Sequence, residues 1–230
     1  MLNIYHGPEY IDKSRFIFEH ISGRTLLLVP DQFSLQAEKD ALYYLGTDSL
    51  MDLRVVDFST LGHKVLQQVG GGRLPLIDKY GRHMLLTKII NEAGEELEIY
   101  RNLSWKNSFI DMMNTMISEM KRYGAVPEDI SGAVESLEDS GFLKYKLTDI
   151  YRIFSRYEDA IEGKYLDSED YMTFYGEKIS QAPMVKESDV WIYGFDTFTP
   201  RNMQIIEKLL LTARSVNIVL AYDSDECFSL

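Results

Sequence analysis

The chain has 230 residues, of which 45% are hydrophobic and 26% are charged, as in an ordinary soluble globular protein. Its 24 basic residues are outnumbered by 36 acidic ones, and the net charge of −12 argues against nonspecific nucleic-acid binding by the surface as a whole. A single cysteine, Cys227, excludes an internal disulfide and an all-cysteine metal site, while the lack of a signal-peptide pattern or a membrane-spanning run predicts a cytoplasmic protein.

The first predicted elements are a short buried strand over residues 2–5 and a helix over residues 14–21. The turn between them has the spacing of a P-loop, G-x-x-x-x-G-K-[ST], with an aspartate in place of the second glycine. The residues at the motif positions are Gly7, Asp12, Lys13 and Ser14. In a working P-loop, backbone N–H groups hold the phosphates, the lysine reaches the outer phosphates and the hydroxyl binds Mg²⁺. These four residues are therefore candidate nucleotide-binding residues.

Three side chains in this turn weaken the prediction. Pro8 has no N–H to donate, and Glu9 adds a negative charge to a site meant for a polyphosphate. Asp12 adds a second negative charge and resists the positive φ that glycine tolerates. We therefore expect ATP and Mg²⁺ to bind weakly or not at all, and a degenerate P-loop and a plain strand–turn–helix both remain open.

An α/β pattern continues along the chain. The apolar run over residues 25–30 predicts a buried parallel strand, and residues 35–45 predict a helix. A third strand is predicted over residues 53–58, and Ser59 is placed to cap a helix that ends near Gln68. Strands that alternate with helices predict a parallel sheet with helices on its faces.

The middle of the chain is predicted to be helical, without strands. The helices cover residues 78–97, 105–123, 142–163 and 168–179. A methionine-rich stripe in the second of these helices is typical of a core, and Lys121 with Arg122 is predicted to be a solvated helix end.

The strand pattern returns near the end of the sequence. Strands are predicted over residues 189–195 and 216–222, on either side of an amphipathic helix over residues 200–213. The predicted organisation is therefore an α/β domain interrupted by an all-helical insertion. The α/β domain comprises residues 1–77 and 189–230, and the insertion comprises residues 78–188.

Short segments spread over nearly the whole chain carry a resemblance to a known family. They are Leu-Leu-Val-Pro-Asp-Gln (27–32), Gln-Ala-Glu-Lys (36–39), Phe-Ser-Thr-Leu (58–61), Ile-Ser-Glu-Met-Lys-Arg-Tyr-Gly (117–124), Pro-Glu-Asp-Ile (127–130), Tyr-Leu-Asp-Ser-Glu-Asp-Tyr (165–171) and Gly-Phe-Asp-Thr-Phe-Thr-Pro (194–200). Their order resembles the first RecA-like domain of superfamily 1 helicases. It is more closely similar to the N-terminal region of AddB-type (RexB-like) subunits of AddAB helicase–nucleases.

The resemblance implies a P-loop NTPase or RecA-like fold and a role in double-strand break repair by homologous recombination. An AddB-type subunit is helicase-like, is not itself a motor, helps to hold DNA and takes part in recognising the Chi signal. Its expected partners are an AddA-type helicase–nuclease subunit and single-stranded DNA, which this chain alone is expected to bind weakly. The nuclease domain and the iron–sulfur cluster of the family lie outside this chain, so we expect no cofactor and assign no catalytic residue and no metal site.

The sequence departs from a working ATPase after the fourth predicted strand. A Mg²⁺-binding aspartate and a neighbouring glutamate are needed there, but Gly194 and Phe195 occupy those places and Asp196 is the only nearby acid. Asp196 thus completes a degenerate nucleotide-binding set. Two other interpretations remain open: a free-standing P-loop ATPase or kinase with an atypical loop, and an interaction domain unrelated to DNA.

Ligands of open α/β sheets bind at the carboxyl ends of the strands, so the loops there are the candidate DNA site. The residues on these loops are Asp31, Gln32, Ser34, Phe58, Ser59 and Thr60, and the resemblance implies contact with single-stranded DNA. Phe58 is placed either to stack on a base or to end a buried strand, and Ser59 either to contact DNA or only to cap its helix.

Overall fold

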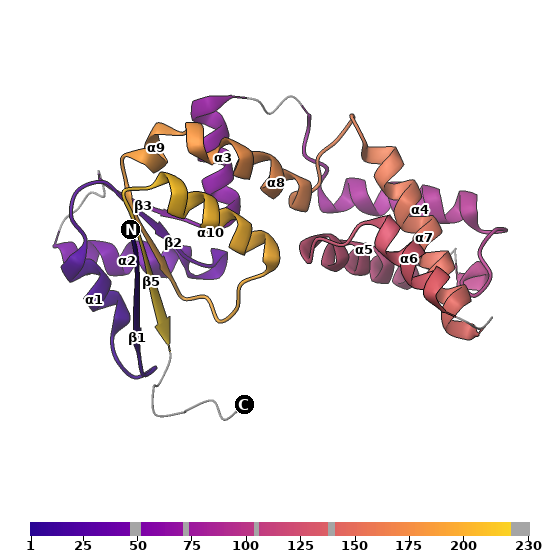
Figure 1. Cartoon of the computed structure of the whole chain (residues 1–230), viewed down its shortest axis with the longest axis horizontal. Coiled ribbons are helices and arrows are strands. Elements are labelled where there is room, and N and C mark those ends of the chain that lie inside the picture. The colour runs from indigo at the N-terminus through magenta and orange to yellow at the C-terminus, as the bar shows by residue number, and fades with distance from the viewer. Residues whose placement is uncertain (47–51, 71–73, 104–105, 138–140, 222–230) are drawn as a thin grey trace. The chain divides into compact units, whose positions relative to one another are not determined.

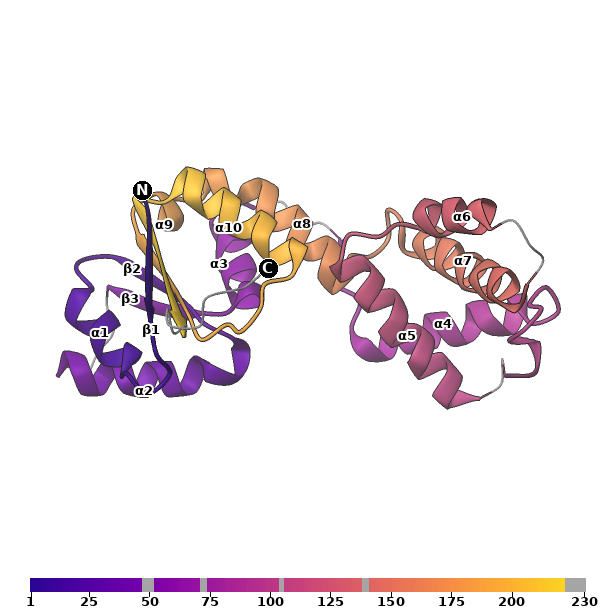
Figure 2. The same ribbon diagram turned by 60° about the horizontal axis from the view of Figure 1, so that its bottom comes forward.

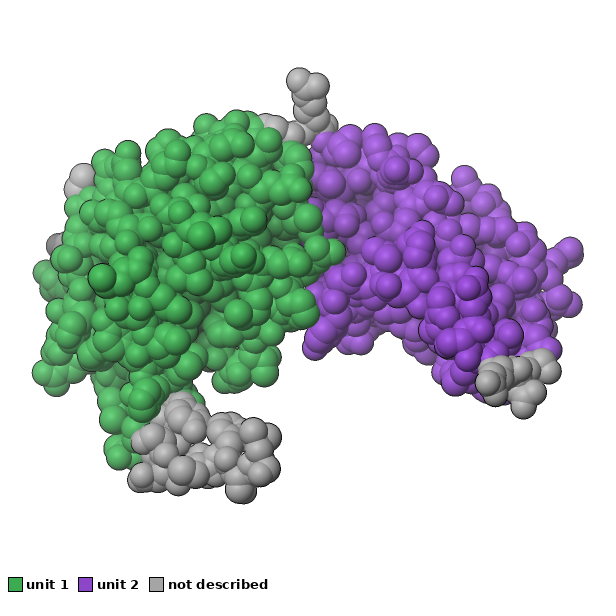
Figure 3. Space-filling model, in the orientation of Figure 1, with its two compact units in different colours: residues 1–71, 172–230 green, residues 72–171 purple. Residues whose placement is uncertain are grey.

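The computed structural model describes residues 1–46, 52–70, 74–103, 106–137 and 141–221. Contacts within the chain define two compact units, which comprise residues 1–71 with 172–230 and residues 72–171 (Figure 3). The predicted division at residues 78 and 188 stays a prediction of domain organisation, and differs from these units chiefly over the stretch before residue 188. Residue 105 of a predicted helix, residue 222 of the last predicted strand and Cys227 lie outside the described residues.

The first unit is built on one sheet of five parallel strands, which confirms the predicted parallel sheet (Figure 1). In sheet order the strands are β1 (Leu2–Gly7), β5 (Ser215–Ala221), β4 (Asp189–Tyr193), β2 (Thr25–Leu28) and β3 (Leu53–Val56). β2 lies inside the sheet, and its Leu27 and Leu28 are each 1% exposed. A strand that is buried on both faces reads as a continuous apolar run, as residues 25–30 do.

β1 lies at an edge of the sheet and pairs only with β5 among the described strands. The side chains of Leu2 and Ile4 are 47% and 56% exposed. The prediction of a buried strand here was therefore wrong, because a short apolar run does not distinguish an edge strand from a central one.

Helices cover both faces of the sheet (Figure 2). α1 (Lys13–His20) and α2 (Ser34–Leu45) pack on one face, and α3 (Phe58–Val69) and α10 (Pro200–Thr212) lie on the other. The remaining elements of this unit are η1 (Asp31–Phe33), most of α8 (Ser168–Lys178), η3 (Ile179–Gln181) and α9 (Pro183–Lys186). The core beneath α1 and α2 is formed by Ile17, Phe18, Leu27, Ala41 and Trp191.

The second unit is helical. It contains α4 (Lys79–Ala93), η2 (Arg101–Leu103), α5 (Asn107–Arg122), α6 (Pro127–Ser136) and α7 (Phe142–Ile161). Met113 of the predicted core stripe is fully buried, which confirms that prediction for this residue, whereas Met112 is 42% exposed. None of the described helices of either unit is long and apolar enough to cross a membrane.

One buried carboxylate anchors the connection after α4 to α7. The side chain of Asp149 accepts hydrogen bonds from the backbone N–H groups of Glu98, Ile99 and Tyr100, at 2.8–3.1 Å. A buried carboxylate must be paired or hydrogen-bonded to offset its lost hydration, and these N–H groups meet that need. The helical unit therefore has its own apolar core and its own polar anchor.

The prediction that Lys121 is solvated was wrong, because its side chain is buried among carboxylates. Lys121 is 4% exposed, and its Nζ lies 2.7 Å from Glu158, 2.7 Å from Asp167 and 2.8 Å from Asp170. We call these four residues the Lys121 cluster. It joins the end of α5 to α7 and to the start of α8. Arg122, the next residue, is half exposed as predicted.

The pKa values within the Lys121 cluster follow from burial and from the lysine charge. Burial raises the pKa of Glu158 and of Asp170, and the lysine opposes that rise only in part. Burial also opposes ionisation of Asp167, but the charge of Lys121 and a backbone N–H bond hold the pKa of Asp167 below its ordinary value. All three carboxylates contact the lysine ammonium, and Asp167 is the one whose pKa is lowered.

Candidate functional site

The turn between β1 and α1 binds its own lysine. Lys13 is 6% exposed, and its Nζ donates to the carbonyl oxygen of Pro8 at 2.6 Å and lies 3.4 Å from those of Glu9 and Ile11. In a phosphate-binding turn the backbone N–H groups point inward, whereas here three carbonyl oxygens surround the ammonium. These oxygens would repel a phosphate, and the lysine is not free to reach one.

The N-terminus of α1 is occupied by a carboxylate. Asp12 caps the helix by accepting the backbone N–H of Arg15 at 2.9 Å, and it accepts the phenol of Tyr44 at 2.5 Å. The bond from the Arg15 N–H and, to a smaller extent, the bond from Tyr44 lower the pKa of Asp12 and so favour its charged form. The same contact with Asp12 raises the pKa of Tyr44 to about 12. A negative charge thus lies where a P-loop would hold a phosphate.

The other predicted nucleotide-binding residues are arranged less specifically. Gly7 ends β1 without a positive φ, so the turn does not require glycine there. Ser14 lies in the first turn of α1. Asp196 is exposed and follows β4, and β5 lies between β4 and β1 in the sheet. The structure therefore brings four of the predicted residues into one turn and places Asp196 on a different loop.

The first candidate DNA loop is a tight turn at the carboxyl end of β2. Asp31 and Gln32 lie in η1 with exposed side chains. Ser34 opens α2, and among the described residues its buried hydroxyl has no hydrogen-bond partner. Asp31 and Gln32 are thus available to a ligand, whereas the Ser34 hydroxyl is available only if the turn moves.

The second candidate DNA loop follows β3. Asp57, not Ser59, caps α3, so the prediction of a serine cap was wrong. The Asp57 carboxylate accepts the N–H groups of Ser59 and Thr60 at 2.6 and 2.9 Å, and the Thr60 hydroxyl at 2.7 Å. Phe58 begins the helix and is only 9% exposed, so it packs as a core residue, while the Ser59 side chain faces solvent.

Three phenylalanines that sequence patterns did not identify as site residues, Phe33, Phe195 and Phe198, lie with Phe58 on the loops after β2, β3 and β4. The Phe58 ring is 5.5 Å from that of Phe195, which is 5.3 Å from that of Phe198. Phe33 of η1 is 47% exposed and borders the same turn, because a Cβ on Gly194 would lie 3.9 Å from its ring. Gly194 itself has a φ of +83°, a conformation that favours glycine. The available signal was a phenylalanine at the end of a predicted strand or shortly after it, in three cases.

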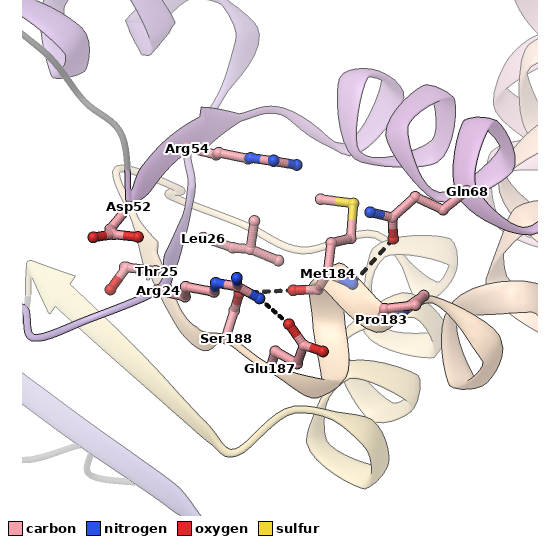
Figure 4. A pocket seen from close by; sticks show the side chains of 10 residues that line it. All are labelled: Arg24, Thr25, Leu26, Asp52, Arg54, Gln68, Pro183, Met184, Glu187 and Ser188. Atoms are coloured by element: carbon pink, nitrogen blue, oxygen red, sulfur yellow. Dashed lines mark hydrogen bonds and ion pairs between the residues drawn. The ribbon is translucent and has the colours of Figure 1, made fainter.

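A different pocket, of about 240 Å³, opens at the amino ends of β2 and β3 (Figure 4). Arg24 forms an ion pair with Glu187 there, and the side chain of Gln68 accepts the N–H of Met184 at 3.0 Å. None of the predicted site residues lines this pocket. It lies at the edge of the sheet opposite to the one where parallel sheets bind ligands, so we do not place the candidate site here.

The described residues contain no group of three or more histidine, cysteine, aspartate or glutamate side chains arranged to hold a metal ion. The Lys121 cluster brings three carboxylates together, but the lysine ammonium occupies the space between them. The three carboxylates of this cluster therefore serve as ion-pair partners of Lys121.

A parallel sheet with helices on both faces places the chain in the α/β class, with a sheet compatible with Rossmann-type and P-loop-type folds. The family model described as "ADDB, N-terminal" matches residues 6–228. The chain therefore belongs to the AddB N-terminal family, which confirms the resemblance seen in its sequence.

Curated relatives share this similarity over nearly the whole chain. The chain is 36% identical over 211 residues to the B-type subunit of the ATP-dependent helicase/deoxyribonuclease of Clostridium tetani, covering 91% of this chain and 18% of the relative. It is 36% identical over 231 residues to the like-named protein from Clostridium kluyveri, covering 97% and 20%. The corresponding protein of Acetivibrio thermocellus is 31% identical over 230 residues, covering 96% and 20%. The chain spans about a fifth of the length of these relatives.

Proposed function

We propose that this chain is the N-terminal, helicase-like part of the AddB-type subunit of an ATP-dependent helicase–nuclease that acts in double-strand break repair. In this proposal it holds single-stranded DNA, contributes to recognition of the Chi signal and associates with an AddA-type subunit in the cytoplasm. It is a DNA-binding scaffold rather than a motor. The names of the relatives support the general role, and the closed turn around Lys13 is the observation that favours a scaffold over a motor.

The proposed DNA path crosses the carboxyl ends of β2, β3 and β4. Gln32 and Ser59 offer exposed hydrogen-bonding side chains, and Phe33 offers an exposed ring on which a base can stack. Phe58 supports this surface from below, against Phe195. Because the net charge is −12, attraction depends on these local donors and rings rather than on a general positive field.

Fluorescence anisotropy with labelled single-stranded oligonucleotides in low salt tests this proposal. Gln32→Ala and Phe33→Ala are expected to weaken binding, the second by about 1–3 kcal/mol if a base stacks on the ring. Leu211→Ala is the matched control, because Leu211 is an exposed apolar residue near the far end of α10. Unchanged affinity in both loop variants, with circular dichroism like that of the wild type, would remove the proposed DNA path.

The alternative, a free-standing P-loop ATPase or kinase, is tested with nucleotide. A ligand present at 100 times its Kd stabilises a protein by about 2.7 kcal/mol. We expect no stabilisation by Mg²⁺–ATP and no hydrolysis, because Lys13 and Asp12 already bind the groups that surround them. Turnover that disappears in Lys13→Ala would favour the enzyme instead.

A further inference from the structure

A small pocket lies between α1 and α2, above the sheet, and the proposed function leaves it without a role. Its volume is about 130 Å³. Its floor is apolar, and Ile17, Leu27 and Val29, each 1% exposed, contribute to it. A mostly apolar concave site with a few polar groups is the usual form of a small-ligand pocket. We call it the ring pocket.

Polar side chains line the rim of the ring pocket. Gln36 and Asp40 lie one turn apart on α2, and the amide of Gln36 donates to the carboxylate of Asp40 at 2.6 Å. Ser14, on α1, and Tyr193, at the end of β4, also line it. Phe33, 47% exposed in η1, brings the pocket next to the proposed DNA path.

The size of the ring pocket suits one aromatic ring. An apolar cavity of about 150 Å³ in another protein accommodates a benzene molecule. The carboxylate of Asp40 repels phosphate, while it accepts hydrogen bonds from amino groups. The apolar floor and the hydrogen-bond acceptor at the rim therefore suit a planar heterocycle that carries N–H donors. They suit a phosphate or an alkyl chain less well.

We propose that the ring pocket receives one base of a single-stranded DNA that passes η1, with preference for a base that carries an exocyclic amino group. The base rests on the apolar floor beside Phe33, and its amino group donates to Asp40. This inference depends on the proposed function, because it requires single-stranded DNA at the same edge of the sheet. It adds a specificity-determining site to that function, because a carboxylate distinguishes adenine, cytosine and guanine from thymine, which has no amino group.

Anisotropy with eight-nucleotide oligonucleotides, each with an abasic site at a different position, tests the proposal. In the wild type one position is expected to be critical, with affinity falling about 5- to 150-fold when its base is removed. Ala37→Met places a longer side chain in the pocket, so this variant is expected to bind abasic and intact oligonucleotides equally. Ala213→Met, at the end of α10, is the matched control and should behave as the wild type.

Asp40→Asn gives a second measurement that leaves the apolar floor intact. The wild type is expected to prefer oligo(dC) and oligo(dA) to oligo(dT), and Asp40→Asn is expected to lose most of this preference. If Ala37→Met fails to fold, this preference decides the question.

The possible outcomes separate this inference from the function on which it rests. If Gln32→Ala and Phe33→Ala weaken binding while Asp40→Asn retains the wild-type base preference, the ring pocket is not a base site and the DNA path stands. If no oligonucleotide binds the wild type, both proposals fail. If Ala37→Met and Asp40→Asn instead weaken only association with an AddA-type subunit, the pocket receives a protein side chain and the base proposal is overturned.

Discussion

A lysine at the position of Lys13 in this sequence pattern can bind either a phosphate ligand or the backbone of its own turn. In a phosphate-binding turn the lysine is a donor for a ligand, whereas here it donates to the carbonyl oxygens of its own turn. A buried ammonium needs hydrogen-bond acceptors to offset its lost hydration, and the carbonyl oxygens of the turn supply them, so these bonds contribute to stability. We therefore assign Lys13 a structural role.

Replacing Lys13 by methionine is expected to destabilise the protein by about 1–3 kcal/mol, because the carbonyl oxygens of the turn lose their charged donor. Urea unfolding followed by circular dichroism measures this change in the free energy of unfolding. Lys39→Met, a substitution at an exposed position on α2, is the control and should change stability by less than about 0.5 kcal/mol. Equal stability of the two variants would show that Lys13 is not held by the turn.

The contact between Asp12 and Tyr44 predicts a titration that one substitution removes. In Asp12→Asn the pKa of Tyr44 is expected to fall from about 12 toward the ordinary tyrosine value. Because the folded state raises this pKa, the contribution of Tyr44 to stability is present below about pH 10 and is lost as pH rises toward 12. A ¹³C NMR titration of labelled tyrosine measures the shift, with Asp31→Asn as the control. A Tyr44 pKa that stays near 12 in Asp12→Asn would rule out Asp12 as its cause.

At the scale of single residues, the sequence predicted an unfavourable phosphate site but not the alternative use of its lysine. Pro8, Glu9 and Asp12 are visible in the motif, whereas the direction of the turn's carbonyl groups is a backbone property that residue types do not reveal. The Ser59 cap was wrong by two residues, because Asp57 is an equally good capping residue and helix boundaries carry that uncertainty.

At the scale of elements, the Lys121 cluster holds three segments together. If Lys121 is replaced by an apolar residue, the three carboxylates around it keep a negative charge that no cation compensates. Removing one partner of a buried ion pair in this way costs about 3–5 kcal/mol of folding stability. Lys121→Met is therefore expected to destabilise strongly in chemical denaturation at pH 7. Lys88→Met is the control, because Lys88 on α4 is an exposed cation whose partner Glu92 is also exposed, and it should cost less than about 1 kcal/mol.

The effect of Lys121→Met is expected to depend on pH. Without the lysine, burial raises the folded-state pKa values of the remaining carboxylates above their unfolded values. A carboxyl group whose pKa is raised by folding contributes stability at low pH, and this contribution is lost as the pH rises. The variant is therefore expected to regain stability as the pH falls, so the difference in free energy of unfolding between variant and wild type should be smaller at pH 5 than at pH 7. A difference that is constant over this range would mean that the carboxylates are not buried together in the variant.

The sequence contained a signal for the burial of Lys121. The buried residues Met113 and Ile117 are spaced four apart on α5, and Lys121 continues the same spacing. Helical periodicity therefore placed the lysine on the buried face. Its partners could not be identified in this way, because Glu158 and Asp167 are 37 and more residues away along the chain.

At the scale of the whole molecule, the helical unit is expected to fold without the rest of the chain. Its apolar core, the Asp149 anchor and the Lys121 cluster all lie within residues 72–171. A polypeptide of residues 74–171 should therefore unfold cooperatively on heating, with a helical circular dichroism spectrum. The same polypeptide with Lys121→Met provides the comparison and should melt at a lower temperature. A broad transition without a folded baseline would show that the unit depends on its surroundings.

The sequence predicted which segments are strands and that the sheet is parallel, because apolar runs alternate with amphipathic helices. It did not predict the order of the strands in the sheet. β2 and β4 are neighbours although the helical unit lies between them in the chain. The periodicity of apolar residues identifies strands but does not say which strands pair with each other. The exposed edge position of β1 is a consequence of that order.

The position of β1 has a consequence for the synthesis of the protein. Asn3 of β1 donates a hydrogen bond to Asn217 of β5 at 2.8 Å, and the two are 214 positions apart in the sequence. A ribosome that adds about 5–20 residues per second needs roughly 10–40 s to cover that distance. During this interval β1 has no partner among the described strands, and Leu2 and Ile4 stay exposed to other nascent chains. Of the described strands, β1 is therefore made first, but it can join the sheet only after β5, the last of them, has been made.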